Sequence, residues 1–134
     1  MSILQLHVRR AATVLALAAL LGACSHGPHH PGGHDVTLTG AQEVPANTST
    51  ASGSSSIRVA HDRSVSGGVR YTGMLATVAH IHEAPVGANG PVIVPLVKTA
   101  DGMFAVPAGT LLTPSQHASY QAGNLYVNVH SAAY

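Results

Sequence analysis

The sequence is poor in cysteine, in aromatic residues and in charge. Its 134 residues include one cysteine and no tryptophan, and the aromatic residues amount to 4%. A single cysteine excludes an intramolecular disulfide. Charged residues make up only 8% and the formal net charge is +1. This balance gives no basis for nucleic-acid binding and lacks the high charge that is typical of a disordered chain.

Glycine, proline and histidine are the residues that the sequence has in quantity. Fourteen glycines and eight prolines suit short strands joined by many turns. Ten histidines outnumber the six lysines and arginines, a balance that favours metal chemistry or pH sensing over charge steering. The length is enough for one domain and not comfortably for two.

Residues 1–23 have the pattern of a secretory signal peptide. Arg9 and Arg10 precede an apolar run at 11–21, which is followed by Gly-Ala-Cys. The run is too short to cross a bilayer as a mature helix. The position of Cys24 resembles the lipobox of bacterial lipoproteins, in which that cysteine is lipidated and becomes the mature N-terminus. We therefore expect a lipid-anchored protein of the bacterial cell envelope, facing the periplasm or the exterior. The alternative is an ordinary signal peptide cut nearby, which would leave a free thiol.

Residues 24–35 form a short tether rich in proline and glycine, a composition that opposes regular structure. The tether contains four histidines, His26, His29, His30 and His34. These side chains are auxiliary candidates for loose metal capture. The alternative is that a short polar tether happens to be rich in histidine.

Residues 36–134 predict one all-β domain. Alternating or continuous apolar runs bounded by turn residues indicate strands at 36–40, 56–60, 65–74, 78–82, 91–98, 103–106 and 125–130. A loop of small residues is expected at 47–54. Thr113 and Pro114 start a short helix at 115–122, which Gly123 ends. Many short strands and one helix predict an antiparallel β-sandwich or Greek-key barrel.

Three local features refine this prediction. Gly67 and Gly68 indicate a β-bulge inside the strand at 65–74. Pro95 indicates that the strand at 91–98 is bent or lies at a sheet edge. The dipeptide at 101–102, Asp-Gly, is a hairpin signal that leads into the strand at 103–106.

Three histidines are expected on one face of a sheet. His80 and His82 are two residues apart in a strand, so their side chains point the same way. In the strand at 125–130, Val127 and Val129 share one face while His130 shares the other with Asn128. If the valines face the core, the three imidazoles stand together on the outer side, beside the glycine-rich loop at 86–90.

Three imidazoles without a thiolate suit Cu(II) or Zn(II). Three protein ligands also leave one coordination position open, as in exchangeable or reactive sites. We therefore predict a metal site formed by His80, His82 and His130, with copper preferred to zinc. The alternative is that His80 and His82 bond loop carbonyls and only brace the loop.

Other residues have subordinate roles in this hypothesis. His61, in an expected turn, is a further auxiliary ligand candidate. Tyr126 and Asn128 share the face of His130 and are candidates to orient the ligands from behind.

Three ordered motifs resemble the CHRD domain, which is named from chordin and is common in bacterial secreted proteins. They are Leu-Thr-Gly-Ala-Gln-Glu-Val-Pro at 38–45, Ala-His-Ile-His at 79–82 with Asn-Gly-Pro-Val at 89–92, and Gly-Asn-Leu-Tyr-Val-Asn-Val-His-Ser at 123–131. The resemblance covers residues 36–134 and implies a β-sandwich module. Its His-x-His strand is similar to the copper-ligand strand of copper/zinc superoxide dismutases.

The sequence departs from the CHRD pattern in two places. The family usually has glycine close after the second histidine, where this chain has Glu-Ala-Pro at 83–85. The final histidine of the family is typically followed by a further strand, whereas this sequence ends at Tyr134. We therefore expect a domain that lacks its last strand and exposes a sheet edge.

The sequence favours a binding module over an enzyme. It contains no Ser/His/Asp spacing, no phosphate-binding loop and no paired carboxylates. A dismutase-like copper enzyme would need a cation near the histidines, and no lysine or arginine lies in a recognisable loop there. We expect a non-catalytic metal-binding module. The alternatives are a metal-free structural or protein-interaction module and a superoxide dismutase-like copper enzyme. The pattern does not identify a protein partner.

Overall fold

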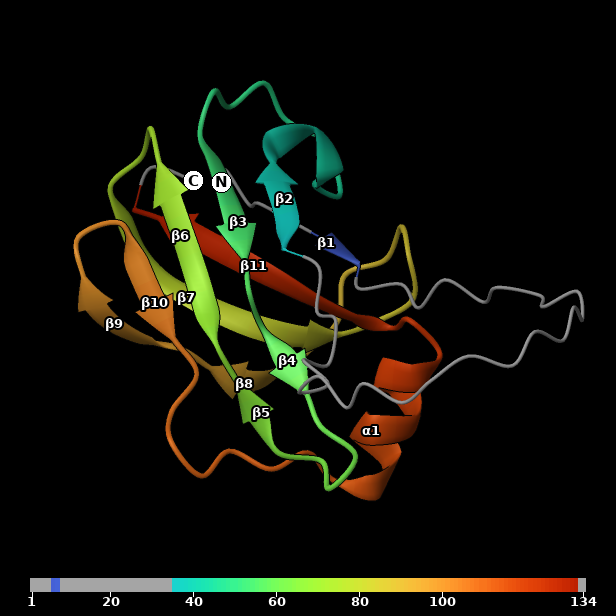
Figure 1. The fold of residues 1–134 in the computed structure, drawn as a ribbon. Helices are drawn as coiled ribbons and strands as arrows, with labels where there is room; N and C mark the ends of the chain where they lie inside the picture. Colours follow the sequence, from blue (N-terminus) through green and yellow to red (C-terminus); the bar gives the residue numbers. More distant parts are fainter. Residues whose placement is uncertain (1–5, 8–34, 133–134) are drawn as a thin grey trace, which may run out of the picture.

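Two antiparallel sheets form the layers of the domain (Figure 1). The computed structural model describes residues 6–7 and 35–132. The first sheet has the strand order β1 (Leu6–His7), β11 (Leu125–Ser131), β7 (Ala76–Glu83) and β8 (Val92–Pro95). The second has the order β2 (Val36–Thr39), β3 (Ser52–Ser55), β6 (Gly68–Thr72), β10 (Met103–Ala105) and β9 (Val97–Ala100).

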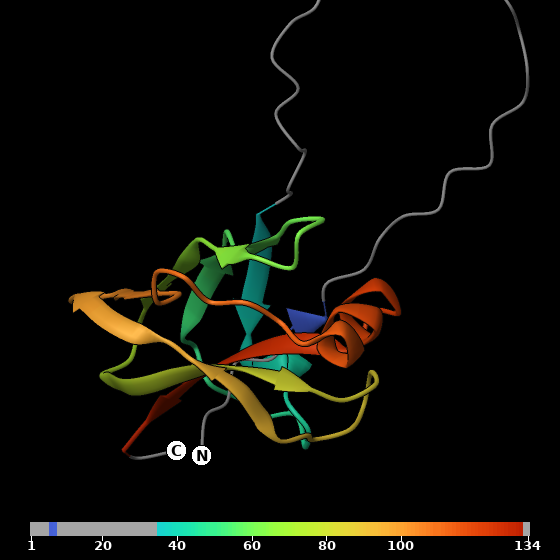
Figure 2. The same cartoon turned by 90° about the horizontal axis from the view of Figure 1, so that it is seen from below.

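Three smaller elements complete the described fold. Strands β4 (Arg58–Val59) and β5 (Val65–Ser66) form a two-stranded sheet, η1 (Gly40–Gln42) is a turn of 3₁₀-helix, and α1 (Pro114–Gln121) lies at one end of the layers (Figures 1 and 2). The architecture confirms the predicted all-β sandwich with one short helix. Neither large sheet closes into a barrel.

The core lies between the two large sheets. Val69 and Phe104 from the second sheet belong to the same buried cluster as Ile81, Val127 and Val129 from the first. Burying each such side chain stabilises the fold by about 1.5–3 kcal/mol relative to leaving it exposed. The prediction that the strand valines face the core is confirmed. The opposite faces of β7 and β11 therefore point outward.

Two predicted strands are each divided in the structure. The strand expected at 65–74 becomes β5 and β6, which belong to different sheets, because Gly67 between them takes a positive φ of 95°. The strand expected at 91–98 becomes β8 and β9, which lie at the edges of the two large sheets. The edge position predicted from Pro95 is thus confirmed. The chain also passes from the first sheet to the second between β8 and β9.

The prediction of a loop at 47–54 is wrong in part. Residues Ser52–Ser55 form β3, which pairs with β2 on one side and β6 on the other. Its sequence, Ser-Gly-Ser-Ser, has no apolar alternation, so its strand character comes from hydrogen bonding to two neighbours. The strand expected at 56–60 is also shorter than predicted, since only Arg58–Val59 pair as β4.

The helix, Pro114–Gln121, begins and ends one residue before the predicted range of 115–122. Thr113 Oγ1 accepts a hydrogen bond from the Gln116 N–H at 3.1 Å, and Gln116 Oε1 accepts one from the Thr113 N–H at 2.9 Å. This reciprocal pair is a capping box. Ser119 on α1 then donates a 2.5 Å hydrogen bond to the carboxylate of Glu83. The helix is thereby tied to the end of β7.

The leader and tether predictions fall almost wholly outside the described residues. Cys24 and the four tether histidines lie in the part that the structure does not describe. Leu6 and His7 form β1, which pairs with Val127 and Tyr126 along the edge of β11 away from β7. Among the described residues, no helix is long and apolar enough to cross a membrane.

A pair of glycine substitutions tests the division between β5 and β6. A Cβ at position 67 would clash with the carbonyl oxygen of Ser56, whereas one at Gly109 would meet no atom within 4 Å. Both glycines have positive φ. Gly109→Ala should therefore lower the free energy of unfolding by about 1–2 kcal/mol. Gly67→Ala should lower it by roughly 2–5 kcal/mol, because a steric clash is added. Urea unfolding of both variants measures the two free energies of unfolding. Equal losses of stability would contradict the close approach of position 67 to the Ser56 carbonyl oxygen.

Candidate metal centre

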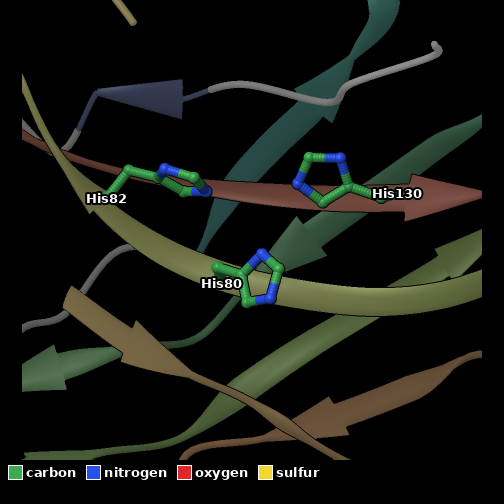
Figure 3. A group of neighbouring side chains, drawn as sticks. All are labelled: His80, His82 and His130. Carbon is green, nitrogen blue, oxygen red and sulfur yellow. The ribbon is translucent and has the colours of Figure 1, made fainter. Parts of the chain in front are cut away.

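The pairing of β7 with β11 brings the three histidines together. Tyr126 lies opposite His82, Asn128 opposite His80, and His130 opposite Val78. In an antiparallel pair, residues directly opposite each other project from the same face. Figure 3 shows the three imidazoles around one space on the outer face of the sheet. One ligand nitrogen from each ring lies within 4.8 Å of the other two.

Each imidazole keeps one buried nitrogen without a hydrogen-bond partner among the described residues. These atoms are Nδ1 of His80, Nε2 of His82 and Nε2 of His130. Leaving a buried polar atom unpaired costs about 1–3 kcal/mol, and native structures have few such atoms. Three of them in one small cluster indicate a place that is built for a ligand.

His82 is held in one tautomer by the loop that follows β7. Its Nδ1 lies 2.9 Å from the carbonyl oxygen of Gly90. Because a carbonyl only accepts hydrogen bonds, Nδ1 carries the proton and Nε2 keeps its lone pair. The ring of Tyr126 stacks on the His82 ring, with centroids 5.0 Å apart and planes inclined by 10°. His82 therefore presents Nε2 in a fixed direction.

Gly90 connects the loop to both of these side chains. Its N–H donates to the Tyr126 hydroxyl oxygen at 2.8 Å, while its carbonyl accepts from His82. A Cβ at position 90 would clash with the carbonyl oxygen of Glu83, so only glycine allows the loop to approach this closely. Sequence reasoning missed this role, although the glycine-rich loop directly after the His-x-His strand was the available signal.

Burial and mutual repulsion keep two of the imidazoles neutral. Desolvation is the largest cause that lowers the pKa of His130 from 6.5 to about 4, followed by the charges that His80 and His82 carry when protonated. Desolvation, then His82, lowers the pKa of His80 as well. Neutral imidazole is the form that binds metal ions. Protons therefore compete weakly for these lone pairs near neutral pH.

The three nitrogens fit a divalent metal with a small adjustment. Nitrogens bound to one ion at about 2.0–2.1 Å can be separated by no more than about 4.2 Å. The ring nitrogens lie within 4.8 Å of one another, so a small approach of the rings brings them into this range. Imidazole ligands suit zinc and copper, so the geometry and the donor atoms agree on this class of ion.

The remaining predicted residues take distinct places. His61 lies in an exposed turn and is not part of the cluster. Tyr126 contacts His82, as described above. Asn128 lies between Tyr126 and His130 on the same face of β11 and is 3% exposed. The loop-bracing alternative is observed for His82 through its Nδ1, and it is compatible with metal binding because Nε2 stays free for an ion.

The family model for the CHRD domain matches residues 35–134. The chain belongs to the CHRD domain family. The CHRD domain thus contains both large sheets apart from β1, together with all three clustered histidines. Membership supports a role as a binding module. The comparisons with curated proteins and with solved structures gave no match.

The lowered pKa of His130 predicts how the stability of the metal-free protein depends on pH. An unfolded histidine titrates near 6.5, whereas folded His130 titrates near 4. Between these values the unfolded chain binds more protons, so the free energy of unfolding falls as the pH drops. The contribution of His130 is complete above pH 6.5 and is lost progressively down to about pH 4.

Urea unfolding between pH 7.5 and pH 4, with a chelator present, measures this slope. His130→Gln keeps a polar side chain that does not titrate in this range, so its slope should be shallower than that of the unaltered protein. Identical slopes would show that His130 is readily protonated in the folded state.

Proposed function

We propose that this CHRD domain binds one copper ion, or less strongly zinc, through His80, His82 and His130, and that it does so without catalysis. The proposal is carried by three clustered histidines, each with a buried nitrogen that has no hydrogen-bond partner within residues 6–7 and 35–132. Nitrogen sites bind Cu(II) more tightly than Zn(II) in the general affinity order. Three histidine ligands leave at least one coordination position for a further ligand.

The positions of the cations support a binding module over a dismutase-like enzyme. All four lysines and arginines among the described residues contact groups outside β7 and β11. The partners are Asp35 for Arg58, the Leu112 carbonyl for Arg63, the Met103 sulfur for Arg70 and Asp101 for Lys98. These contacts tie the four cations to partners other than the three histidines.

A metal-free structural or interaction module is the second candidate. The hydrogen bond from His82 to Gly90 favours it, since that bond braces the loop without any ion. This metal-free candidate function accounts for only one of the three histidines. The buried unpaired nitrogens of His80 and His130 have no role in it.

Copper titration tests the site directly. The four tether histidines, His26, His29, His30 and His34, are first changed to Gln in the full chain, so that loose binding does not obscure the result. In this background, His80→Ala and His130→Ala should each weaken Cu(II) binding by more than the ~100-fold that even indirect changes around metal sites can cause. His61→Ala, which removes an exposed histidine outside the cluster, is the matched control and should bind as before.

The same titration has a stability readout. At ~100-fold above its dissociation constant, Cu(II) should raise the free energy of unfolding by about 2.7 kcal/mol. Calorimetry measures both the binding of Cu(II) and this gain in stability. If the His80, His130 and His61 variants bind alike, or if none binds micromolar copper, the three-histidine site does not exist.

We also propose that Cys24 is lipidated and holds the domain at the membrane of a bacterial cell envelope. The support is the Leu-Gly-Ala-Cys ending of the apolar run at 11–21. Cys24→Ser should release the protein from the membrane fraction or leave its precursor uncleaved, because the lipid attaches to the thiol. Fractionation with an immunoblot for precursor and mature forms measures this. A processed mutant that stays with the membranes would exclude the lipid anchor.

A further inference from the structure

Asn128 lies at the centre of the histidine face. It stands directly opposite His80 in the pairing of β7 with β11, and it is flanked on its own strand by Tyr126 and His130. Side chains paired in this way have Cβ atoms about 4.5–5.5 Å apart. Asn128 is 3% exposed, and its Oδ1 is buried without a hydrogen-bond partner among the described residues.

This unpaired oxygen comes from a residue on the same face of the sheet as the three imidazoles. When His80 carries its proton on Nε2 and His130 on Nδ1, the buried nitrogens of both rings present lone pairs, as Nε2 of His82 does. Together with Oδ1 of Asn128, four buried acceptors then lack a donor. A water molecule has two protons and satisfies at most two of them. A cation satisfies all four at once.

We propose that Oδ1 of Asn128 is an oxygen ligand of the ion held by the three histidines, and that Asn128 favours divalent ions over Cu(I). The inference rests on the proposed function. An amide oxygen is a hard donor, and Cu(II) and Zn(II) both accept oxygen ligands beside nitrogen ligands. Cu(I) prefers soft ligands, and a neutral oxygen adds little to its binding. The residue therefore stabilises the divalent state selectively.

Asn128→Leu tests this role, because leucine keeps a similar volume and removes the oxygen. In the background without tether histidines, the variant should bind Cu(II) and Zn(II) ~10–100-fold more weakly and Cu(I) about as before. A tenfold loss for Cu(II) alone raises the Cu(II)/Cu(I) potential by about 59 mV. The metal-free variant should also melt at a higher temperature, because the unpaired buried oxygen is gone.

Asn128→Asp is the second variant. It keeps an oxygen at the same place and adds negative charge, so its binding of Cu(II) and Zn(II) should equal or exceed that of the unaltered protein. The measurements are competition titrations for each ion, voltammetry of the copper complex and thermal unfolding without metal. A structural role for Asn128 would lower the melting temperature of Asn128→Leu and would leave the copper potential unchanged.

The outcomes separate this inference from the proposed function. Suppose that the unaltered protein binds Cu(II) and that Asn128→Leu binds Cu(I) and Cu(II) each as tightly as the unaltered protein does. The three-histidine site then stands, and the proposal that Asn128 supplies an oxygen ligand is wrong. Equal losses for Cu(I) and Cu(II), or a metal-free Asn128→Leu that is less stable or does not fold, also overturn it. Failure of the unaltered protein to bind any of these ions overturns the proposed function and the inference together.

Discussion

The candidate site and the core both depend on the register between β7 and β11. Seven residue pairs join these strands. The register turns Ile81, Val127 and Val129 inward, and it leaves His80 and His130 on the outer face. A slip by one residue would exchange the two faces of a strand, which would turn the imidazoles toward the core between the sheets and the valines away from it. The hydrophobic effect therefore maintains the arrangement of the site as well as the fold.

A second constraint acts on the direction of His82, one of the three candidate ligands. Gly90 accepts a hydrogen bond from His82 and donates one to Tyr126, so the loop fixes both the tautomer and the orientation of the imidazole. Neighbouring groups that hold a ligand in this way commonly tune a metal site. The helix α1 supports the same end of β7 through the hydrogen bond from Ser119 to Glu83. The loop and α1 thus both hold the end of β7 at which His82 lies.

The outer face carries a stability cost that the core has to offset. Three imidazole nitrogens and the oxygen of Asn128 are buried without partners in the part of the chain that the structure describes, and each such atom costs about 1–3 kcal/mol. A small domain has a net stability of only about 5–15 kcal/mol, so a cluster of this kind is a large burden for 98 described domain residues, 35–132. Proteins tolerate such costs mainly at functional sites. The cost of these unpaired buried atoms is therefore consistent with the proposed role of the histidine face as a metal site.

The sequence by itself determined which side chains share a face and where the helix begins. His80 and His82 point the same way because side chains alternate along any strand, and Thr113 caps α1 through contacts within one turn. Both properties are local. Only the tertiary structure decided that Ser52–Ser55 form a central strand, that Gly67 divides a predicted strand, and that Asn128 stands opposite His80. These features depend on pairing between residues that are far apart in the chain, and no local pattern of apolar residues specifies that register.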